Sequence, residues 1–381
     1  MIEVANRLHT VEEYYFSKKL REVNTLIASG KSIINLAIGS PDLRPPQKVI
    51  DAISNSLNDA TAHKYQSYQG LPELRGAIAD FYKEHFSVSL SPLTEVLPLI
   101  GSKEGIMHIS MTYLNAGDEV LIPNPGYPTY QSVTKLVGAK GVLYELDEVN
   151  NWMPDFEALE KKDLSKVKMM WVTYPHMPTG AQPTKKLFEG LVAFAKRHNI
   201  LIVNDNPYSF ILNDSPKSIL SVKGAKEVCL ELNSLSKTFN MAGWRVGMVL
   251  GDSVHINNIL KVKTNMDSGM FYGIQKGAIE ALKCSKMWFS TLNSVYQQRR
   301  DLVWQLAEVL NCTYDKKATG LFVWAKLPAD VKSEEFIDLI LKEYHIFITP
   351  GTIFGSKGEG YIRFSLCATT EVLEEAIARV K

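Results

Sequence analysis

The stretch NSLSKTFNMAGWRVGMVLG, residues 233–251, brings an amine, small hydroxyl residues and an arginine into one short segment. Lys237 directly follows an apolar run that is typical of a buried strand. Ser234 and Ser236 stand just before it, and Arg245 comes eight positions later. A guanidinium can grip a phosphate with two parallel N–H donors. An amine held near a cation loses its proton more readily and can then attack an aldehyde. The segment favours an anion bound beside a reactive amine, but SxSK taken alone would favour a surface lysine at a strand-to-loop turn.

The chain around this segment alternates short apolar runs with helical patterns, which is typical of an α/β domain with a mainly parallel sheet. Several runs are apolar throughout, as strands covered by helices on both faces should be. The expected strands are 95–101, 119–125, 141–146, 168–175, 200–208, 228–236 and 245–251. A helical pattern such as that at 184–198 lies between them. We therefore predict a large domain over residues 46–280, with a seven-stranded sheet flanked by helices.

The pattern changes near residue 252, where long helical segments begin and run to residue 311. Short strands are then expected at 321–327, 345–350 and 361–366, with helices at 332–344 and 369–380. This order predicts a smaller α+β domain. The N-terminal residues, which include the apolar run KSIINLAIG, are expected to pack beside it. The small domain is thus assigned to residues 1–45 and 281–381.

Composition narrows the partners that can be expected. The chain has 381 residues, of which 45% are apolar and 22% charged, which suits two globular domains. A formal net charge of +1 gives no basic field for nucleic acid or an anionic membrane. The N-terminal residues have no apolar signal segment, and no run approaches the roughly 18 to 20 residues that span a bilayer. Neither the four cysteines nor the eight histidines have metal-ligand spacing. We expect a cytoplasmic protein without a metal site and without nucleic-acid or membrane partners.

The motif SLSKTFNMAGWRVG resembles the cofactor-lysine motif of the class I/II aminotransferases, the fold-type I enzymes that depend on pyridoxal 5′-phosphate (PLP). The similarity covers nearly the whole chain, in order and at the expected spacings. It implies the fold-type I PLP transferase architecture, with Lys237 holding the cofactor as a Schiff base (aldimine). Lys237 would later move a proton between the substrate Cα and the cofactor C4′ atom. Ser234, Ser236 and Arg245 become ligands of the cofactor phosphate.

A second motif, VNDNPY at 203–208, resembles the D-x-x-Y element of the same family. Asp205 would hold the pyridine nitrogen, because a protonated ring is the electron sink of this chemistry. Tyr208 would donate a hydrogen bond to the phenolic oxygen O3′. An Asx-turn beside an ordinary half-buried tyrosine is the alternative.

Further matches extend the expected site. In LIGSKEGIMHI, Ser102 and Lys103 would bind the phosphate at a helix N-terminus, where free N–H groups attract anions. In NPGYPTY, Tyr127 matches the aromatic residue that stacks on the cofactor ring and lies beside the substrate. In GEGYIRFSL, Arg363 matches the arginine that pairs with the substrate α-carboxylate. The backbone of Gly39, in LAIGSPD, is expected near that carboxylate. For each of these side chains, an ordinary structural role stays open as the alternative.

Two segments resemble parts of the family that complete the site of a second subunit. In HKYQSYQGLPELR (63–75), Tyr65 matches the tyrosine that reaches the phosphate of the neighbouring subunit. NMDSGMF (265–271) resembles a loop lent to the same partner site. We therefore expect a homodimer with shared active sites.

The sequence departs from the family at YPHMPTG (174–180), where the family usually has an asparagine that donates to O3′. That position is Met177, whose thioether cannot donate a hydrogen bond. O3′ would then depend on Tyr208. His176 is an alternative donor to O3′ or to substrate.

The expected activity is a PLP-dependent aminotransferase. It would move an amino group from an α-amino acid to a 2-oxo acid, such as 2-oxoglutarate or pyruvate, by a ping-pong mechanism through a Lys237 aldimine. Overall, the pattern is most similar to the aspartate, alanine and diaminopimelate types of the family. Two other functions stay open, because one fold supports several chemistries. They are a PLP-dependent β-eliminating lyase and a catalytically silenced PLP-binding regulatory protein.

Overall fold

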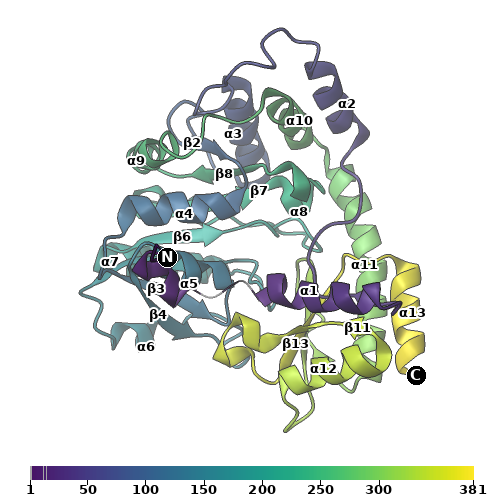
Figure 1. Ribbon diagram of the computed structural model, residues 1–381. Helices are drawn as coiled ribbons and strands as arrows, with labels where there is room; N and C mark the ends of the chain where they lie inside the picture. Colours follow the sequence, from purple (N-terminus) through teal and green to yellow (C-terminus); the bar gives the residue numbers. More distant parts are fainter. Residues whose placement is uncertain (1, 12, 14) are drawn as a thin grey trace.

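The computed structural model describes residues 2–11, 13 and 15–381, so positions 1, 12 and 14 of the predicted segment 1–45 lie outside the description. Figure 1 shows a central sheet covered by helices, with the C-terminal lobe in yellow beside it. The seven strands of this sheet follow the order β2-β8-β7-β6-β5-β3-β4. Their bounds are β2 (Val96–Leu99), β3 (Glu119–Asn124), β4 (Lys140–Glu145), β5 (Val167–Val172), β6 (Leu201–Asp205), β7 (Cys229–Ser234) and β8 (Gly247–Leu250).

All neighbouring strands of the large sheet are parallel except at β8, which runs antiparallel to both β2 and β7. The expectation of a mainly parallel, seven-stranded α/β domain is therefore confirmed. An antiparallel pair needs no crossover helix, so a short connection can join β7 to β8. That connection carries Lys237 and Arg245 and stays at the edge where β6 and β7 end.

Helices cover both faces of this sheet. They are α2 (Gln47–Ser56), α3 (Pro72–Phe86), α4 (Ser102–Tyr113), α5 (Pro128–Leu136), α6 (Phe156–Glu160), α7 (Lys185–His198), α8 (Leu235–Thr238), α9 (Ser253–Lys263) and α10 (Tyr272–Leu282). Met169 and Trp171 of β5 pack in one core cluster with residues of α4, α5 and α9. Met170 and Val172 pack in another cluster with residues of α3, α7 and α10. Burial on both faces explains why β5 is apolar at consecutive positions.

The C-terminal lobe contains a four-stranded antiparallel sheet in the order β12-β13-β10-β9. Its strands are β9 (Thr313–Tyr314), β10 (Phe322–Lys326), β12 (Thr349–Pro350) and β13 (Tyr361–Ser365). The helices of this region are α11 (Lys286–Val309), α12 (Ser333–Tyr344) and α13 (Thr370–Val380). The predicted helical stretch 252–311 is thus interrupted by loops between α9, α10 and α11.

The N-terminal residues join this lobe through a small parallel sheet, in which β1 (Ile34–Asn35) pairs with β11 (Ile346–Phe347). Helix α1 (Tyr15–Ala28) lies against the same lobe, and its Phe16 and Val23 share a core cluster with Phe347 (Figure 1). The arrangement is compatible with the expected small domain, while the boundaries at residues 46 and 281 stay a prediction. No helix in the described part of the chain is long and apolar enough to cross a membrane. The expected cytoplasmic location also stays a prediction.

Candidate active site

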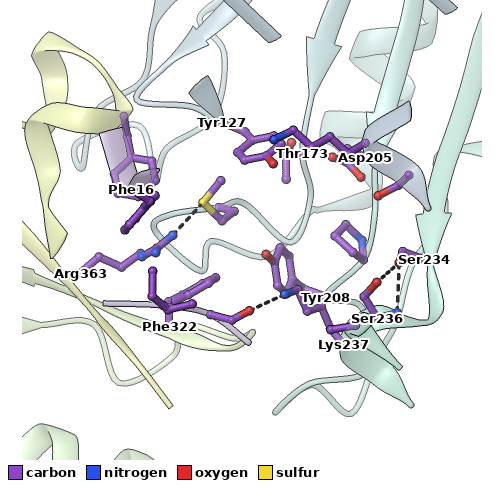
Figure 2. A pocket seen from close by; sticks show the side chains of 18 of the residues that line it. Phe16, Tyr127, Thr173, Asp205, Tyr208, Ser234, Ser236, Lys237, Phe322 and Arg363 are labelled. Atoms are coloured by element: carbon purple, nitrogen blue, oxygen red, sulfur yellow. Dashed lines mark hydrogen bonds between the residues drawn. The ribbon is translucent and has the colours of Figure 1, made fainter. Parts of the chain in front are cut away.

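A cavity of about 560 Å³ lies at the edge of the large sheet where β6 and β7 end, facing the C-terminal lobe. Every predicted site residue except Tyr65 lines it: Gly39, Ser102, Lys103, Tyr127, Asp205, Tyr208, Ser234, Ser236, Lys237, Arg245 and Arg363. Figure 2 labels Tyr127, Asp205, Tyr208, Ser234, Ser236, Lys237 and Arg363 among them. Residues that are far apart in the sequence meet here because the carboxyl ends of parallel strands share one edge of the sheet.

Lys237 lies in the single turn of α8, immediately after β7. Ser234 caps this turn, and its hydroxyl accepts a hydrogen bond from the backbone N–H of Ser236 at 3.0 Å. The ammonium of Lys237 donates to the carbonyl of Gly39. Burial lowers the pKa of Lys237 to about 8, and the nearby Arg363 and Arg245 add to this effect. The amine therefore loses its proton closer to neutral pH than an exposed lysine does, as an amine that must attack an aldehyde requires.

The N-terminus of α4 and the guanidinium of Arg245 form the cationic end of the cavity. Gly101 is the N-cap of α4 at φ +86°, and no side chain caps this helix. A Cβ at Gly101 would collide with the Arg245 guanidinium, so glycine leaves space between the helix end and this cation. Lys103 lies in the first turn, and its pKa is lowered by burial and by Arg245. Two cations beside free helix N–H groups suit a phosphate dianion.

The two serines before Lys237 complete this end. Their hydroxyls are buried and lie 2.7 Å apart, and both line the cavity. Figure 2 shows them on the same side as Lys237. Their position allows neutral hydrogen bonds to an anion that Arg245 neutralises.

Asp205, the last residue of β6, lies at another wall of the cavity. Its Oδ2 accepts a hydrogen bond from the Tyr130 hydroxyl at 2.9 Å, and that hydroxyl lies 2.6 Å from Thr173 Oγ1. Its buried Oδ1 has no hydrogen-bond partner among the described residues. Burial raises the pKa of the Asp205 carboxyl to about 7, although the Tyr130 hydrogen bond works in the opposite direction. A cationic N–H group of a ligand would satisfy Oδ1 and favour the ionised carboxylate.

Tyr130 is a site residue that the sequence analysis missed. Its hydroxyl donates the hydrogen bond to Asp205, and its ring stacks on Trp171 with ring centroids 4.8 Å apart. Its ring also meets Tyr127 edge-on at 5.5 Å. The signal was present in NPGYPTY, because residues three apart in the first turn of α5 project to the same side.

The sequence analysis also missed Glu231, a residue of β7 that binds the end of β6. This fully buried carboxylate accepts hydrogen bonds from the side-chain amides of Asn204 and Asn206, each at 3.2 Å. The Tyr82 hydroxyl donates to it at 2.9 Å. Both sequence neighbours of Asp205 are therefore bound to one group. The contacts join segments far apart in the sequence, and no local motif reveals them.

Arg363 comes from β13 and forms the wall toward the C-terminal lobe. It donates to the Ala37 carbonyl at 2.9 Å, and its Nη1 lies 3.4 Å from the sulfur of Met177. Its guanidinium stacks over Phe322, 3.8 Å from the ring centroid, and over Phe354 at 4.7 Å. Stacked in this way, the guanidinium has a fixed plane that suits a planar carboxylate.

Tyr208 and Met177 line the same cavity as Arg363 and Asp205. Burial raises the pKa of Tyr208, so its hydroxyl stays protonated and can donate a hydrogen bond. Met177 lines the cavity beside Arg363, where the family motif would have an asparagine. His176 does not line this cavity, and its Nδ1 lies 2.8 Å from Thr179 Oγ1. The donor role considered for His176 gains no support from this placement.

Tyr65 lies outside the cavity and is 90% exposed. With His63, Lys64 and Gln66 it lines a surface hollow that also includes residues 268–271. The two segments expected to reach a second subunit therefore lie side by side on the surface.

The residues of the cavity fit the group that the sequence resemblance implies. PLP carries a phosphate, a basic ring nitrogen and an aldehyde. Arg245 with the α4 N-terminus suits the phosphate, the unsatisfied Oδ1 of Asp205 suits the protonated nitrogen, and Lys237 suits the aldehyde.

Comparisons with known proteins agree with this fit. A family model described as "Aminotransferase class I and II" matches residues 31–380. The LL-diaminopimelate aminotransferase of Aquifex aeolicus is 39% identical over 383 residues, which cover 100% of this chain and 99% of that protein. The apo structure of BacF from Bacillus subtilis superposes with a TM-score of 0.96 at 35% identity, covering 100% of this chain and 98% of BacF. The aromatic aminotransferase from Pyrococcus horikoshii has a TM-score of 0.86 at 31% identity, covering 94% and 97% of the two chains.

Proposed function

This chain belongs to the class I and II aminotransferases, enzymes that depend on pyridoxal phosphate, and from this premise we propose that it moves the amino group of an α-amino acid to 2-oxoglutarate or pyruvate. The transfer would occur in two half-reactions, in which the first oxo acid leaves before the second one binds. The meeting of Lys237, Asp205 and Arg363 in one cavity carries this proposal, because each suits a different part of the chemistry.

The phosphate end of the cavity anchors the cofactor. Arg245, Ser234 and Ser236 bind the phosphate together with the backbone N–H groups of Ser102 and Lys103 at the start of α4. The partial positive charge of the helix N-terminus and the charge of the guanidinium would both stabilise the phosphate. Tyr127, at the N-cap of α5, lines the cavity and would stack on the cofactor ring.

When bound, pyridoxal phosphate supplies an aldehyde that bonds to amines and a ring that accepts electrons from the amino acid Cα. Asp205 holds the proton on the ring nitrogen, and Tyr130 keeps the carboxylate oriented through Oδ2. Tyr208 donates to the phenolic oxygen. The lowered pKa of Lys237 would let its amine act as the base that takes the proton from the donor Cα.

Arg363 orients the donor. Its planar fork binds the α-carboxylate, and the Gly39 backbone, which lies within hydrogen-bond reach of Lys237, lines the same end of the cavity. Fixing the carboxylate would align the Cα–H bond with the amine of Lys237. This alignment would raise the rate because the reacting groups are already oriented.

We further propose a homodimer with shared active sites. The support is the position of Tyr65 and residues 268–271 in one surface hollow, outside the cavity of their own chain. The hydroxyl of Tyr65 would donate to the phosphate in the partner site.

The relatives suggest two donor classes for comparison. One is named for LL-diaminopimelate and the other for aromatic substrates. Both share the α-carboxylate and amine that this cavity is proposed to bind, and they differ in the side chain, which ends in a second ammonium and carboxylate in one and consists of an aromatic ring on one methylene in the other.

A half-reaction screen tests the proposal. The PLP-loaded protein is mixed with single amino acids without an acceptor, while the cofactor absorbance and the ammonia concentration are followed. One equivalent of oxo acid per site without ammonia is the expected result. Continuous ammonia release would instead indicate the eliminating lyase, and no change with any amino acid would contradict catalysis by this site.

A further inference from the structure

The charged side chains of the cavity are unevenly distributed. Lys103 and Arg245 lie at the α4 N-terminus, Asp205 lies at the end of β6, and Lys237 lies in α8. All four belong to the part proposed to hold the cofactor. Arg363 is the charged residue on the wall toward the C-terminal lobe, and the proposed function assigns it to the α-carboxylate.

The surroundings of Arg363 are apolar. The rings of Phe322 and Phe354 lie 3.8 and 4.7 Å from its guanidinium, and the ring of Phe16 lies at 5.8 Å. Figure 2 shows Phe16 and Phe322 close to Arg363, with the thioether of Met177 beside it. Phe322 fills the space that a side chain at position 39 would occupy, so Gly39 admits this ring to the wall.

Helix α1 extends this apolar wall. Phe16 is 8% exposed, and Leu20, one helical turn further along, also lines the cavity. Ile38 lines it from the segment after β1. Ser17 is polar but uncharged, and none of the other described residues on this wall carries a charge besides Arg363.

Such a wall discriminates between donors by the remote end of their side chains. Once Arg363 is paired with the α-carboxylate, a second carboxylate would find no further cation among the described residues of this wall, and an ammonium would lose its water beside the like-charged Arg363. An aromatic ring or a branched aliphatic chain would gain from leaving water and from contact with the phenylalanine rings.

We propose that the amino donor of this enzyme has a large apolar side chain, aromatic or branched aliphatic, which packs against Phe16, Phe322, Phe354 and Met177. The proposal rests on the proposed function only in taking Arg363 as the α-carboxylate site.

Binding of unreactive carboxylates to the PLP-loaded enzyme tests the wall without requiring turnover. The probes are 3-phenylpropanoate, which pairs one carboxylate with a ring, and pimelate, which carries a carboxylate at each end. By calorimetric titration, we expect 3-phenylpropanoate to bind at least about tenfold more tightly, given the burial of a ring. Equal or tighter binding of pimelate would overturn the proposal.

Substitution of Phe16 locates the selectivity on α1. Phe16→Ser should reduce the preference for 3-phenylpropanoate over acetate by about tenfold, because a ring contact is lost, whereas Phe16→Leu should retain most of it. Ile27→Ser is the matched control, since Ile27 lies on the same helix and is 50% exposed. A ratio of two affinities does not depend on how much protein is folded. An unchanged ratio in Phe16→Ser would refute the role of this helix.

The donor panel separates failure of this inference from failure of the proposed function. Single-turnover rates are measured with phenylalanine, leucine, aspartate and LL-diaminopimelate. Faster conversion of phenylalanine or leucine supports both the aminotransferase function and the apolar donor. Faster conversion of aspartate or LL-diaminopimelate retains the aminotransferase and overturns the apolar donor. If no amino acid is converted, the proposed function fails, and the carboxylate titration still decides the nature of the wall.

Discussion

The carboxyl of Asp205 has one oxygen bound to Tyr130 and one without a partner among the described residues. This asymmetry is unusual for a buried carboxylate, because most buried polar atoms in proteins are satisfied. Its raised pKa, about 7, has a direct consequence for stability. A carboxyl whose pKa is higher in the folded than in the unfolded state stabilises the fold most at low pH. This contribution is lost as pH rises through the folded pKa.

We therefore expect the cofactor-free enzyme to lose stability from Asp205 between about pH 4 and pH 7, by at most about 4 kcal/mol. Thermal unfolding from pH 4 to 8 measures this loss. Asp205→Asn, which cannot ionise, should flatten the dependence of the cofactor-free protein. In wild type, the gain in melting temperature on adding cofactor should grow with pH, because the ionised carboxylate binds a cationic ring best. An equal slope in wild type and variant would contradict the assignment.

Met177 provides a spectroscopic prediction. A thioether cannot donate to the phenolic oxygen, so a Met177→Asn variant should stabilise the phenolate and hold the imine proton less tightly. We expect the pH midpoint of the visible cofactor band to fall in Met177→Asn and to stay unchanged in the apolar control Met177→Leu. A spectrophotometric pH titration measures both. An unchanged or higher midpoint in the asparagine variant would reject the explanation.

At this scale the sequence was most informative where motifs are contiguous. SLSKTFNMAGWRVG and VNDNPY predicted Lys237, Arg245, Asp205 and Tyr208, which all line the cavity. Glu231 and Phe322 could not be predicted in the same way, because their contacts depend on the pairing of distant segments. Glu231 meets Tyr82, 149 positions away along the chain.

Among the elements, the end of β6 is held by side-chain hydrogen bonds to the neighbouring strand β7. Glu231 of β7 accepts hydrogen bonds from both neighbours of Asp205 and from the backbone of Ile219 at 3.0 Å. Burial raises the pKa of Glu231, while these donors oppose the shift. The group links β6, β7 and the loop before β7.

Replacement of Glu231 by glutamine should destabilise the protein by about 1–3 kcal/mol, because an amide nitrogen would face other donors in a buried site. Urea unfolding of the cofactor-free protein measures this. Glu227→Gln is the control, since the pair of Glu227 with Lys196 is exposed and such pairs contribute at most about 1 kcal/mol. If Glu231 also positions Asp205, the variant should weaken cofactor binding while Glu227→Gln does not. Equal effects of the two variants on cofactor binding would argue against a positioning role of Glu231.

The elements of the large domain were predictable because strands buried on both faces are continuous apolar runs. HIFITP was different. It was expected as one strand, but it forms β11 and β12, which belong to different sheets. Ile346 pairs with Ile34, whereas Thr349 pairs with Arg363. A run of apolar residues does not reveal that its two halves have different partners.

On the scale of the whole molecule, the position of Tyr65 matters most. The neighbouring loop is braced by an ion pair between Lys263 and Asp267 at 2.9 Å and by a hydrogen bond from the Gly269 N–H to Asp267 at 2.7 Å. A loop fixed by these contacts, next to an exposed tyrosine, forms a surface that is suited to contact with another subunit. The dimer itself stays a prediction.

Light scattering should give a dimer, and Tyr65→Phe should weaken cofactor affinity by about tenfold through loss of one hydrogen bond to a charged group. Co-expression of Tyr65→Ala with Lys237→Ala tests the exchange. A mixed dimer has one site in which both native residues meet, so it should recover tight cofactor binding that neither variant has alone. If a purified mixed dimer does not recover tight cofactor binding, Tyr65 lies outside the partner site. The matched control is Tyr68→Phe, because Tyr68 lies on the same segment and is 43% exposed. A substitution in the buried core, such as Phe81→Tyr, is not a suitable control.

The pairing of β1 with β11 sets an order of events during synthesis. Ile34 is made early, whereas its partner Ile346 is made about 300 residues later, and Arg363 comes later still. The residues proposed to anchor the cofactor, from Ser102 to Arg245, are all made before Ile346 and Arg363. A nascent chain can therefore gather its phosphate site while the substrate end is still absent. If Lys237 and Arg363 act together as proposed, the amine can act on amino acids only after Arg363 has been made and has joined the cavity.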